Sequence, residues 1–480
     1  MSILVIDVGT SGVRAAVVRP DATVTAEHRV EVLPSTPAPG LVEFDAVAMA
    51  SAALDVARRS LAEGGPVEGV GVTNQRASTI VWDRATGAPV GPGLGWQDLR
   101  TVGDCLVLQA EGLRLAPNQS ATKARHLLDL ADPGRERDLC IGTVDSWIVW
   151  NLTEGRVHAT DTTNAGLTGL LTGDAAGWDD KVLDQLNIPI ASLATIVDSS
   201  GPVGEATALP GAPLVCGLAG DQQASLVGQG CVAPGPAKVT FGTGGMLDLV
   251  VGPERPAFPR RGPAGTFPIV AWRRGDELVW GIEAVMLSAG TNVEWLRDDL
   301  GIIPDAAASH EVAAGCTDTD GVVYVPALLG LGTPRWDFGA RGALLGVTRG
   351  TGRAQIARAV LEGVAQRGAD LVAAAEADAA TSIATLRVDG GMSANPTFTQ
   401  AVADATQRPV EISPVVEATT LGAAFLAGLH LGTWAGWDDV AAAWSPLRVV
   451  EPGVPLDRAR WARAVERAGE WYPELTAIDF

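Results

Sequence analysis

The chain starts with two apolar runs on either side of a glycine-rich turn. Residues 3–6 and 13–18 have the length and apolar character of buried strands, and Gly9 lies between them. We therefore predict a β-hairpin here. Asp7 directly follows the first run, and a carboxylate at the end of a buried strand costs free energy unless a cation meets it. The nearest arginine, Arg14, belongs to the second strand, so we expect Asp7 to meet a metal ion instead.

Strand-like and helix-like patterns alternate through the rest of the first half. The run VEGVGVT predicts a strand, and apolar residues at helical spacing predict three helices. Such alternation indicates α/β layers. The strand is expected over residues 67–73 and the helices over 46–61, 120–130 and 143–152.

The second half continues in the same way. Asn395 followed by Pro396 is good chemistry for a helix start, because asparagine caps helices and proline suits the first turn. The pattern predicts a strand over residues 385–389 and helices over 289–300, 353–375, from 396 onward, 419–431 and 457–471.

A second glycine hairpin opens the second half of the chain. Residues 239–252 (VTFGTGGMLDLVVG) repeat the order of the first hairpin: an apolar strand, a Gly-Thr turn and another apolar strand. Chance similarity of two turns is the alternative, but the repeat favours two halves of like fold that face each other across a cleft. The segment rich in glycine and proline before it suggests a boundary, so we expect domains over 1–235 and 236–480.

Composition narrows the functional classes. The formal net charge of −21 argues against binding to nucleic acid or to an anionic membrane surface. No apolar run approaches the roughly 20 residues of a membrane span. The five cysteines are scattered and never form C-x-x-C, which is typical of reduced thiols. We expect a cytoplasmic protein, and a homodimer is possible from the sequence.

Several familiar sites are absent from the sequence. No lysine follows a glycine, so there is no P-loop, and no G-x-G-x-x-G follows a strand. The five histidines have no zinc spacing, and there is no G-x-S-x-G nucleophile motif. An aspartic protease would need an aspartate in the second hairpin, which reads T-F-G-T.

The two hairpins are the best candidates for a phosphate site. The amides and hydroxyls of Thr10 and Ser11 suit an anion, and the turn at Gly242 and Thr243 could bind the same phosphates from the other side. Asp7 could hold a hydrated Mg²⁺ ion. Each loop alone could be a structural turn, but the pair favours phosphate binding.

Two further clusters suggest a second substrate. Asp221, in AGDQQASLVGQG, lies at an apparent helix start, where it could be a helix cap or a base for a substrate hydroxyl. Arg76 offers several N–H donors for hydroxyl groups, and the ring of Trp96 can cover the C–H faces of a ligand. Together they suit a polyhydroxy ligand. The alternative is a surface arginine and a core tryptophan.

Together these blocks resemble the FGGY carbohydrate kinases of the actin/hexokinase/Hsp70 ATPase superfamily, and most of all the glycerol kinases. The resemblance runs from residue 3 to about 436. It rests on GVTNQR, GWQDLRT, GDQQASLVGQ, FGTGG, AGTNVEWLRD and VDGGMSAN, on SATKARHLLD and RGALLGVTRGTGRAQIARAVLE for the two family signatures, and on PGLVEFD.

The resemblance implies an α/β protein of two actin-like (ribonuclease H-like) domains with ATP and a sugar or polyol between them. Asp221 would be the catalytic base, and Asp7 would organise Mg²⁺. The phosphates would meet Thr10, Ser11, Gly242 and Thr243; the adenosine would lie along Gly290, Glu294, Gly391 and Asn395; and the acceptor would contact Arg76, Trp96, Asp221 and Gln222.

The departures from glycerol kinases concern the acceptor. Glycerol kinases have a glutamate where this chain has Ala77, an aromatic residue where it has Met246, and a tyrosine near the position of Asn118. His126 also stands where the family usually has a tryptophan, and Glu294 stands where glycerol kinases often have a glutamine. A lost carboxylate leaves a glycerol hydroxyl unpaired, so we expect a larger polyol or a sugar. A true glycerol kinase and a non-catalytic actin-like nucleotide-binding protein are the alternatives.

Overall fold

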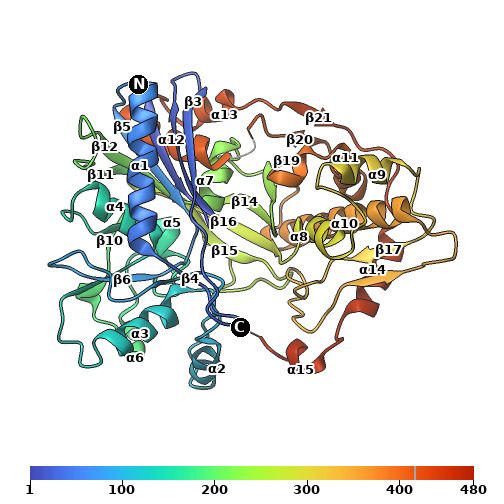
Figure 1. Ribbon diagram of the computed structural model, residues 1–480, viewed down its shortest axis with the longest axis horizontal. Helices are drawn as coiled ribbons and strands as arrows, with labels where there is room; N and C mark the ends of the chain where they lie inside the picture. The colour runs from blue at the N-terminus through green and yellow to red at the C-terminus, as the bar shows by residue number, and fades with distance from the viewer. Residues whose placement is uncertain (416–417, 480) are drawn as a thin grey trace.

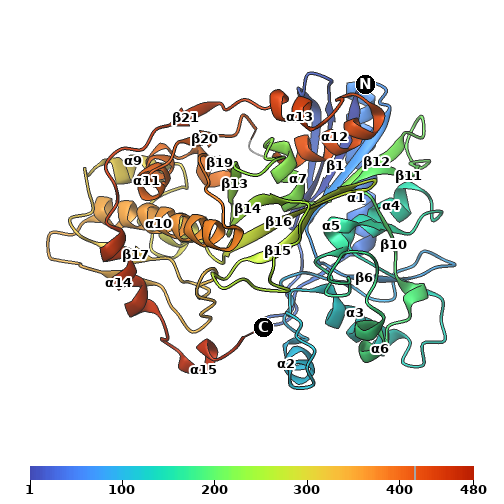
Figure 2. The ribbon, with the colours of Figure 1, turned by 180° about the vertical axis from the view of Figure 1, so that it is seen from behind.

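The computed structural model describes residues 1–415 and 418–479. Two mixed β-sheets, each with helices packed against it, form two α/β domains that lie side by side (Figures 1 and 2). The first sheet runs in the order β11 (Ser200–Glu205), β12 (Leu214–Gly220), β5 (Gly69–Asn74), β1 (Ile3–Val8), β2 (Gly12–Val18) and β3 (Val24–Glu31).

The second sheet has seven strands. Its order is β15 (Phe267–Arg274), β16 (Glu277–Met286), β14 (Gly245–Gly252), β13 (Ala237–Phe241), β19 (Leu386–Asp389), β20 (Val410–Ile412) and β21 (Arg448–Val450).

The predicted internal repeat is confirmed and extends beyond the hairpins. The β1–β2 hairpin corresponds to β13–β14, and the next two strands, β5 and β12 or β19 and β20, are parallel to the first strand of the hairpin. An antiparallel strand closes the same edge of each sheet, β11 in one and β21 in the other. Six strands of each sheet therefore share one spatial order and relative direction, although the chain forms β11 before β12 but β21 after β20.

The predicted helices form close to their expected positions. Asn395 caps α11, where its Oδ1 accepts a hydrogen bond from the amide of Phe398. These helices are α1 (Ala46–Gly64), α3 (Ser120–Ala131), α4 (Val144–Leu152), α10 (Arg353–Ala379), α11 (Pro396–Thr406), α12 (Ala418–Leu431) and α14 (Arg458–Ala468).

One predicted helix differs from expectation. Residues 289–300 form a single α-helical turn, α8 (Thr291–Glu294), that continues as a π-helical segment, Trp295–Asp299. The ring of Trp295 stacks on the buried Tyr324 at 5.7 Å between centroids. Insertions of this kind often re-aim side chains at functional sites.

Two helices cross between the domains at very short range. These are α7 (Asp221–Gly228) and α12, near the centre of Figure 1. A Cβ atom built on Gly422 would lie 1.7 Å from the carbonyl oxygen of Ala224, and one on Gly228 would lie 2.0 Å from that of Ala418. Glycine at both positions thus lets the two backbones touch, and it fixes α7, whose first residue is Asp221.

The last described residues return to the domain junction. Asp479 pairs with Arg114 of the N-terminal half at 3.0 Å and also with Arg261 of the C-terminal half. Four of the five cysteines are buried free thiols, and Cys316 is partly exposed. Among the described residues, no helix is both long and apolar enough to cross a membrane.

Candidate active site

Asp221 lies at the junction of the two domains, where β12 ends and α7 begins. Gly220 is the cap of this helix, so Asp221 is its first residue and not its cap. The carboxylate accepts a hydrogen bond from the amide of Gln222 at 2.8 Å, and 29% of its side chain is exposed. It is therefore supported from behind and open toward solvent.

Arg76 directly follows β5 and contacts Asp221 from the side. Its Nε lies 3.3 Å from Oδ1 of Asp221, and its Nη1 donates to Oε1 of Gln223 at 3.3 Å. Its Nη2 lies 2.6 Å from Oε2 of Glu283, a residue of β16 in the other domain. Only 10% of the Arg76 side chain is exposed, so it is not a surface arginine.

A buried lysine completes this charged cluster. Lys238 on β13 donates to Oε1 of Gln222 and lies 2.6 Å from Oδ2 of Asp248 on β14. Sequence reasoning missed Lys238, Asp248 and Glu283. The signal that could have revealed them is a charged residue within each of three apolar strands.

Burial and neighbouring charges oppose each other in this cluster. Burial raises the pKa of Asp221, although Arg76 and Lys238 partly offset this by favouring the charged form. Burial also raises the pKa of Asp248 to about 7, against the pull of Lys238. Burial alone would lower the pKa of Arg76, but Glu283 and Asp221 raise it. The arginine therefore stays charged beside a carboxylate that is more basic than usual.

Trp96, predicted to contact the acceptor, also contacts the predicted phosphate site. Nε1 of Trp96 donates to Oγ1 of Thr10 at 3.2 Å, so the loop of Trp96 touches the first glycine hairpin. The backbone oxygen of Trp96 accepts a hydrogen bond from the buried Lys123 at 3.3 Å. Trp96 is partly buried between these contacts and is not an ordinary core residue.

The three positions that depart from glycerol kinases lie in different surroundings. Ala77 is buried with φ at +62°, and its carbonyl accepts from Ser120 at 3.0 Å. Asn118, two residues before Ser120, is exposed. Met246 is partly buried and lies two residues before Asp248 on β14, so both side chains share one face of the strand.

The first hairpin has the tight turn that its sequence predicts. The amide of Gly9 donates to the carbonyl of Gly12 at 2.9 Å, which places Thr10 and Ser11 at the tip. Asp7 is buried beneath this turn, and its Oδ2 accepts a hydrogen bond from Thr419 at 3.0 Å.

Sequence reasoning set Arg14 aside as a partner of Asp7. In the structure Arg14 stands directly opposite Asp7 in the β1–β2 register, so the two side chains share one face of the sheet. A protein cation thus lies beside this carboxylate.

The second hairpin and the loop before α8 are joined by backbone hydrogen bonds. The amides of Ala289 and Gly290 donate to the carbonyls of Thr243 and Gly242, both at 2.8 Å. A Cβ on Gly290 would lie 2.6 Å from the Gly242 oxygen, so only glycine fits. At Gly242 and Gly391, in contrast, a Cβ would meet nothing closer than 4.0 Å, and a ligand has room to approach the backbone.

The remaining adenosine candidates lie in α8 and around the start of α11. Asn395 is occupied as a helix cap, and its Nδ2 donates to Ser309 at 2.9 Å. Glu294 and Gly391 are exposed. Asp389, which sequence reasoning missed, is buried at the end of β19 and accepts a hydrogen bond from Ser225 of α7 at 2.9 Å.

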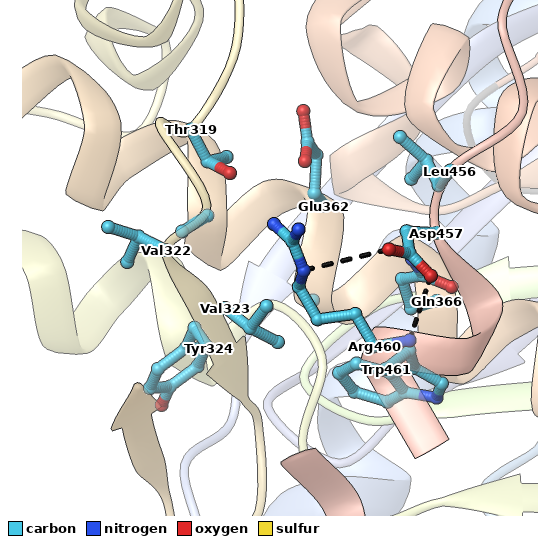
Figure 3. A pocket seen from close by; sticks show the side chains of 12 residues that line it. Thr319, Val322, Val323, Tyr324, Glu362, Gln366, Leu456, Asp457, Arg460 and Trp461 are labelled. Atoms are coloured by element: carbon cyan, nitrogen blue, oxygen red, sulfur yellow. Dashed lines mark hydrogen bonds and ion pairs between the residues drawn. The ribbon is translucent and has the colours of Figure 1, made fainter. Parts of the chain in front are cut away.

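The described residues hold no group of three or more histidine, cysteine, aspartate or glutamate side chains that could bind a metal on their own. A cavity of about 110 Å³ lies elsewhere, between β17 (Val323–Val325), α10 and α14 (Figure 3). Arg460 of α14 lines it and pairs with Asp457, the cap of the same helix, with 3.6 Å between the charged atoms. None of the predicted site residues lines this cavity.

Comparison with known proteins covers nearly the whole chain. Residues 2–228 match the N-terminal domain of the FGGY family of carbohydrate kinases, and residues 237–431 match its C-terminal domain. Glycerol kinase from Aromatoleum aromaticum is 41% identical over 98% of this chain and 99% of its own length. Glycerol kinase from Trichlorobacter lovleyi is 42% identical, with the same coverage.

Solved structures agree with these matches. Plasmodium falciparum glycerol kinase with ADP has a TM-score of 0.89 and 27% identity, covering 100% of this chain and 99% of that one. A xylulose kinase from Rhodospirillum rubrum has a TM-score of 0.82 at 22% identity, covering 99% of each chain, and shows the shared fold.

Proposed function

The chain belongs to the FGGY family of carbohydrate kinases, and we propose that it transfers the γ-phosphate of ATP to a hydroxyl of a small sugar or polyol other than glycerol. As a member of this family it is a phosphotransferase that uses ATP and an alcohol acceptor. We place the domain boundary between residues 235 and 236, with the acceptor and the catalytic base on the N-terminal side and the nucleotide mainly on the other.

The contact between Arg76 and Asp221 carries this proposal. The carboxylate is buried enough to be more basic than usual, yet it is open on one side and is held by an arginine 3.3 Å away. Such a group can orient a hydroxyl and accept its proton as the oxygen attacks the γ-phosphate in line. Arg76 keeps the ionised carboxylate in place and can donate to further substrate oxygens, as Gln222 can.

The residues of both hairpins fit a nucleotide phosphate. The turn at Thr10 and Ser11 offers amides and hydroxyls, and in the turn of Gly242 and Thr243 a Cβ on Gly242 would meet nothing closer than 4.0 Å. Gly290, Glu294, Gly391 and Asn395 would line the adenosine. The buried carboxylate of Asp7, an oxygen ligand of the kind that Mg²⁺ prefers, would hold the hydrated ion. Mg²⁺ neutralises charge on the transferring phosphoryl group when it is bound.

The acceptor pocket supports a substrate other than glycerol. The methyl group of Ala77 cannot accept a hydrogen bond, and Met246 and Asn118 replace two rings with narrower side chains. A glycerol hydroxyl left without a partner in a buried site costs about 1–3 kcal/mol, or roughly 5- to 150-fold in kcat/KM. A longer polyol or a ketose can fill the added space and place its hydroxyls on other groups.

The test is a panel of acceptors in an assay of ATP consumption with Mg²⁺. We expect C4–C6 polyols or ketoses to exceed glycerol in kcat/KM, and Asp221→Asn to abolish transfer to every acceptor. A far higher kcat/KM for glycerol than for all other acceptors would contradict the proposed substrate. Full activity of the Asp221→Asn variant would contradict the proposed base.

A glycerol kinase is the second candidate, because the relatives of that name are 41–42% identical over nearly the whole chain. The same panel separates the two. A non-catalytic actin-like protein would bind ATP but would not consume it, whichever acceptor is offered. The cluster of Asp221, Arg76 and Trp96 would then have no role.

A further inference from the structure

Three charged residues form a row across neighbouring strands of the C-terminal sheet. Lys238 on β13 stands opposite Asp248 on β14, and Asp248 stands opposite Glu283 on β16. Residues directly opposite on antiparallel strands have side chains on the same face. Lys238 and Asp248 are fully buried, and Glu283 is 7% exposed.

Both ends of this row reach into the N-terminal domain. Lys238 donates to Oε1 of Gln222, the residue after Asp221 on α7. Glu283 lies 2.6 Å from Nη2 of Arg76, which is the shortest of the contacts of that guanidinium. Figure 2 shows β13, β14 and β16 beside α7 at the junction of the domains.

The row is not explained by stability alone. With Arg76 and Asp221 it brings two positive and three negative groups together in a buried place. Removing charges from water is costly, and well-packed apolar residues are often as stable as a buried ion pair or more so. Asp248 is fully buried, and the contact of its Oδ2 with Lys238 at 2.6 Å is its main support. The arrangement therefore calls for a role in the site that it touches.

We propose that Glu283 and Lys238, the latter held by Asp248, are positioning residues through which the C-terminal domain fixes Arg76 and the catalytic base. This inference rests on the proposed function, in which Asp221 is that base. Glu283 sets where the guanidinium of Arg76 lies, and Arg76 in turn holds Asp221. Lys238 holds the start of α7 through Gln222 and adds a positive charge near Asp221.

The two ends of the row act on Asp221 with opposite sign. The charged groups that face Asp221 are Arg76, Lys238 and Glu283, with Asp248 behind Lys238. A nearby cation favours the ionised carboxylate and a nearby anion disfavours it. Neutralising Glu283 therefore lowers the pKa of Asp221, and removing Lys238 raises it. A base acts only when ionised, so the acid limb of kcat/KM against pH follows these shifts.

The experiment compares pH profiles of kcat/KM for the preferred acceptor. The variants are Glu283→Gln and the double variant Lys238→Met with Asp248→Leu, which removes the ion pair without leaving a buried charge unpaired. We expect the acid limb to move to lower pH in the first and to higher pH in the second, by about one pH unit each. The control is Glu277→Gln, an exposed residue on the same strand, which should leave the profile unchanged.

A direct titration makes the result independent of turnover. In protein labelled with ¹³C at aspartate side chains, the signal that disappears in Asp221→Asn identifies Asp221, and its pKa should show the same two shifts. Opposite shifts support the proposal. Equal shifts, no shift, or only a uniform loss of activity at every pH would overturn it. If the wild-type enzyme phosphorylates no acceptor, the proposed function fails, and the titration still decides whether this row controls Asp221.

Discussion

The crossing of α7 and α12 makes Gly422 the position most sensitive to a single added methyl group. In Gly422→Ala the new Cβ would lie 1.7 Å from the carbonyl oxygen of Ala224, and the two helices must move apart by about 1.3 Å before this contact reaches 3.0 Å. The Cβ is fixed to the backbone of α12 and the oxygen belongs to the backbone of α7, so no side-chain rotation relieves the overlap. Overpacking of this kind costs about 1–3 kcal/mol, and we expect the upper end here.

Thermal unfolding and kinetics test this prediction together. A loss of about 3 kcal/mol corresponds to a fall in Tm of roughly 6–12 °C for domains of this size. The kcat should fall as well, because Ala224 lies one turn after Asp221 and the displaced helix carries that carboxylate away from Arg76.

A matched control separates the effect of the crossing from the effect of replacing glycine in a helix. Gly103 in α2 (Val102–Ala110) is exposed, and a Cβ there would meet nothing within 4 Å. Gly103→Ala should stabilise the protein by about 0.5–1 kcal/mol. If Gly422→Ala melted at the wild-type temperature, the close approach of the two helices would be refuted.

Three further variants test other parts of the structure. Burial lowers the pKa of His158 to about 4, so the free energy of unfolding falls by about 3 kcal/mol as the pH drops from about 6.5 to 4. The variant His158→Phe should reduce this loss, as measured by urea unfolding at several pH values. An identical pH dependence in the variant would contradict the prediction. Lys123→Met should raise KM for the acceptor more than KM for ATP, because it releases the loop of Trp96. Equal changes in both would argue against this. Asp7→Asn should increase the Mg²⁺ concentration needed for half-maximal activity, and an unchanged Mg²⁺ titration would remove Asp7 from the metal site.

The local parts of the fold could be predicted from the sequence. The two hairpins follow from short apolar runs around Gly-Thr turns, and the start of α11 follows from Asn395 and Pro396, because these features depend on neighbours in the chain. The π-helical segment after α8 could not be predicted, since the stacking of Trp295 on Tyr324 joins residues that are distant in sequence.

The candidate site was predictable only in part, for the same reason. Asp221, Arg76 and Trp96 stand out because their surroundings resemble a family, whereas Glu283 is a single acidic residue in an apolar strand. Its contact with Arg76 depends on the register of β14 and β16 and on how two domains meet. The position of Arg14 opposite Asp7 shows the same limit, because a carboxylate's partner across a hairpin is fixed by a register that no motif specifies.

The internal repeat conserves topology while exchanging side chains between strands. Asp7 on β1 stands beside Thr73 on β5, and at the corresponding place in the other sheet Thr240 on β13 stands beside Asp389 on β19. Each sheet therefore has one buried carboxylate beneath its glycine hairpin, but on a different strand.

The hydroxyl that binds each carboxylate comes from a helix of the other half of the sequence. Thr419 of α12 donates to Asp7 at 3.0 Å, and Ser225 of α7 donates to Asp389 at 2.9 Å. Of the two helices, α12 packs directly on the N-terminal sheet, where a Cβ on Gly71 would lie 2.4 Å from the carbonyl oxygen of Ala423. The hydrogen bond from Thr419 to Asp7 therefore lies within this packed unit, and a rotation of one domain against the other would stretch the hydrogen bond from Ser225 to Asp389. Because Ser225 lies on the same short helix as Asp221, this bond joins the carboxylate beneath the second hairpin to the helix that begins with Asp221.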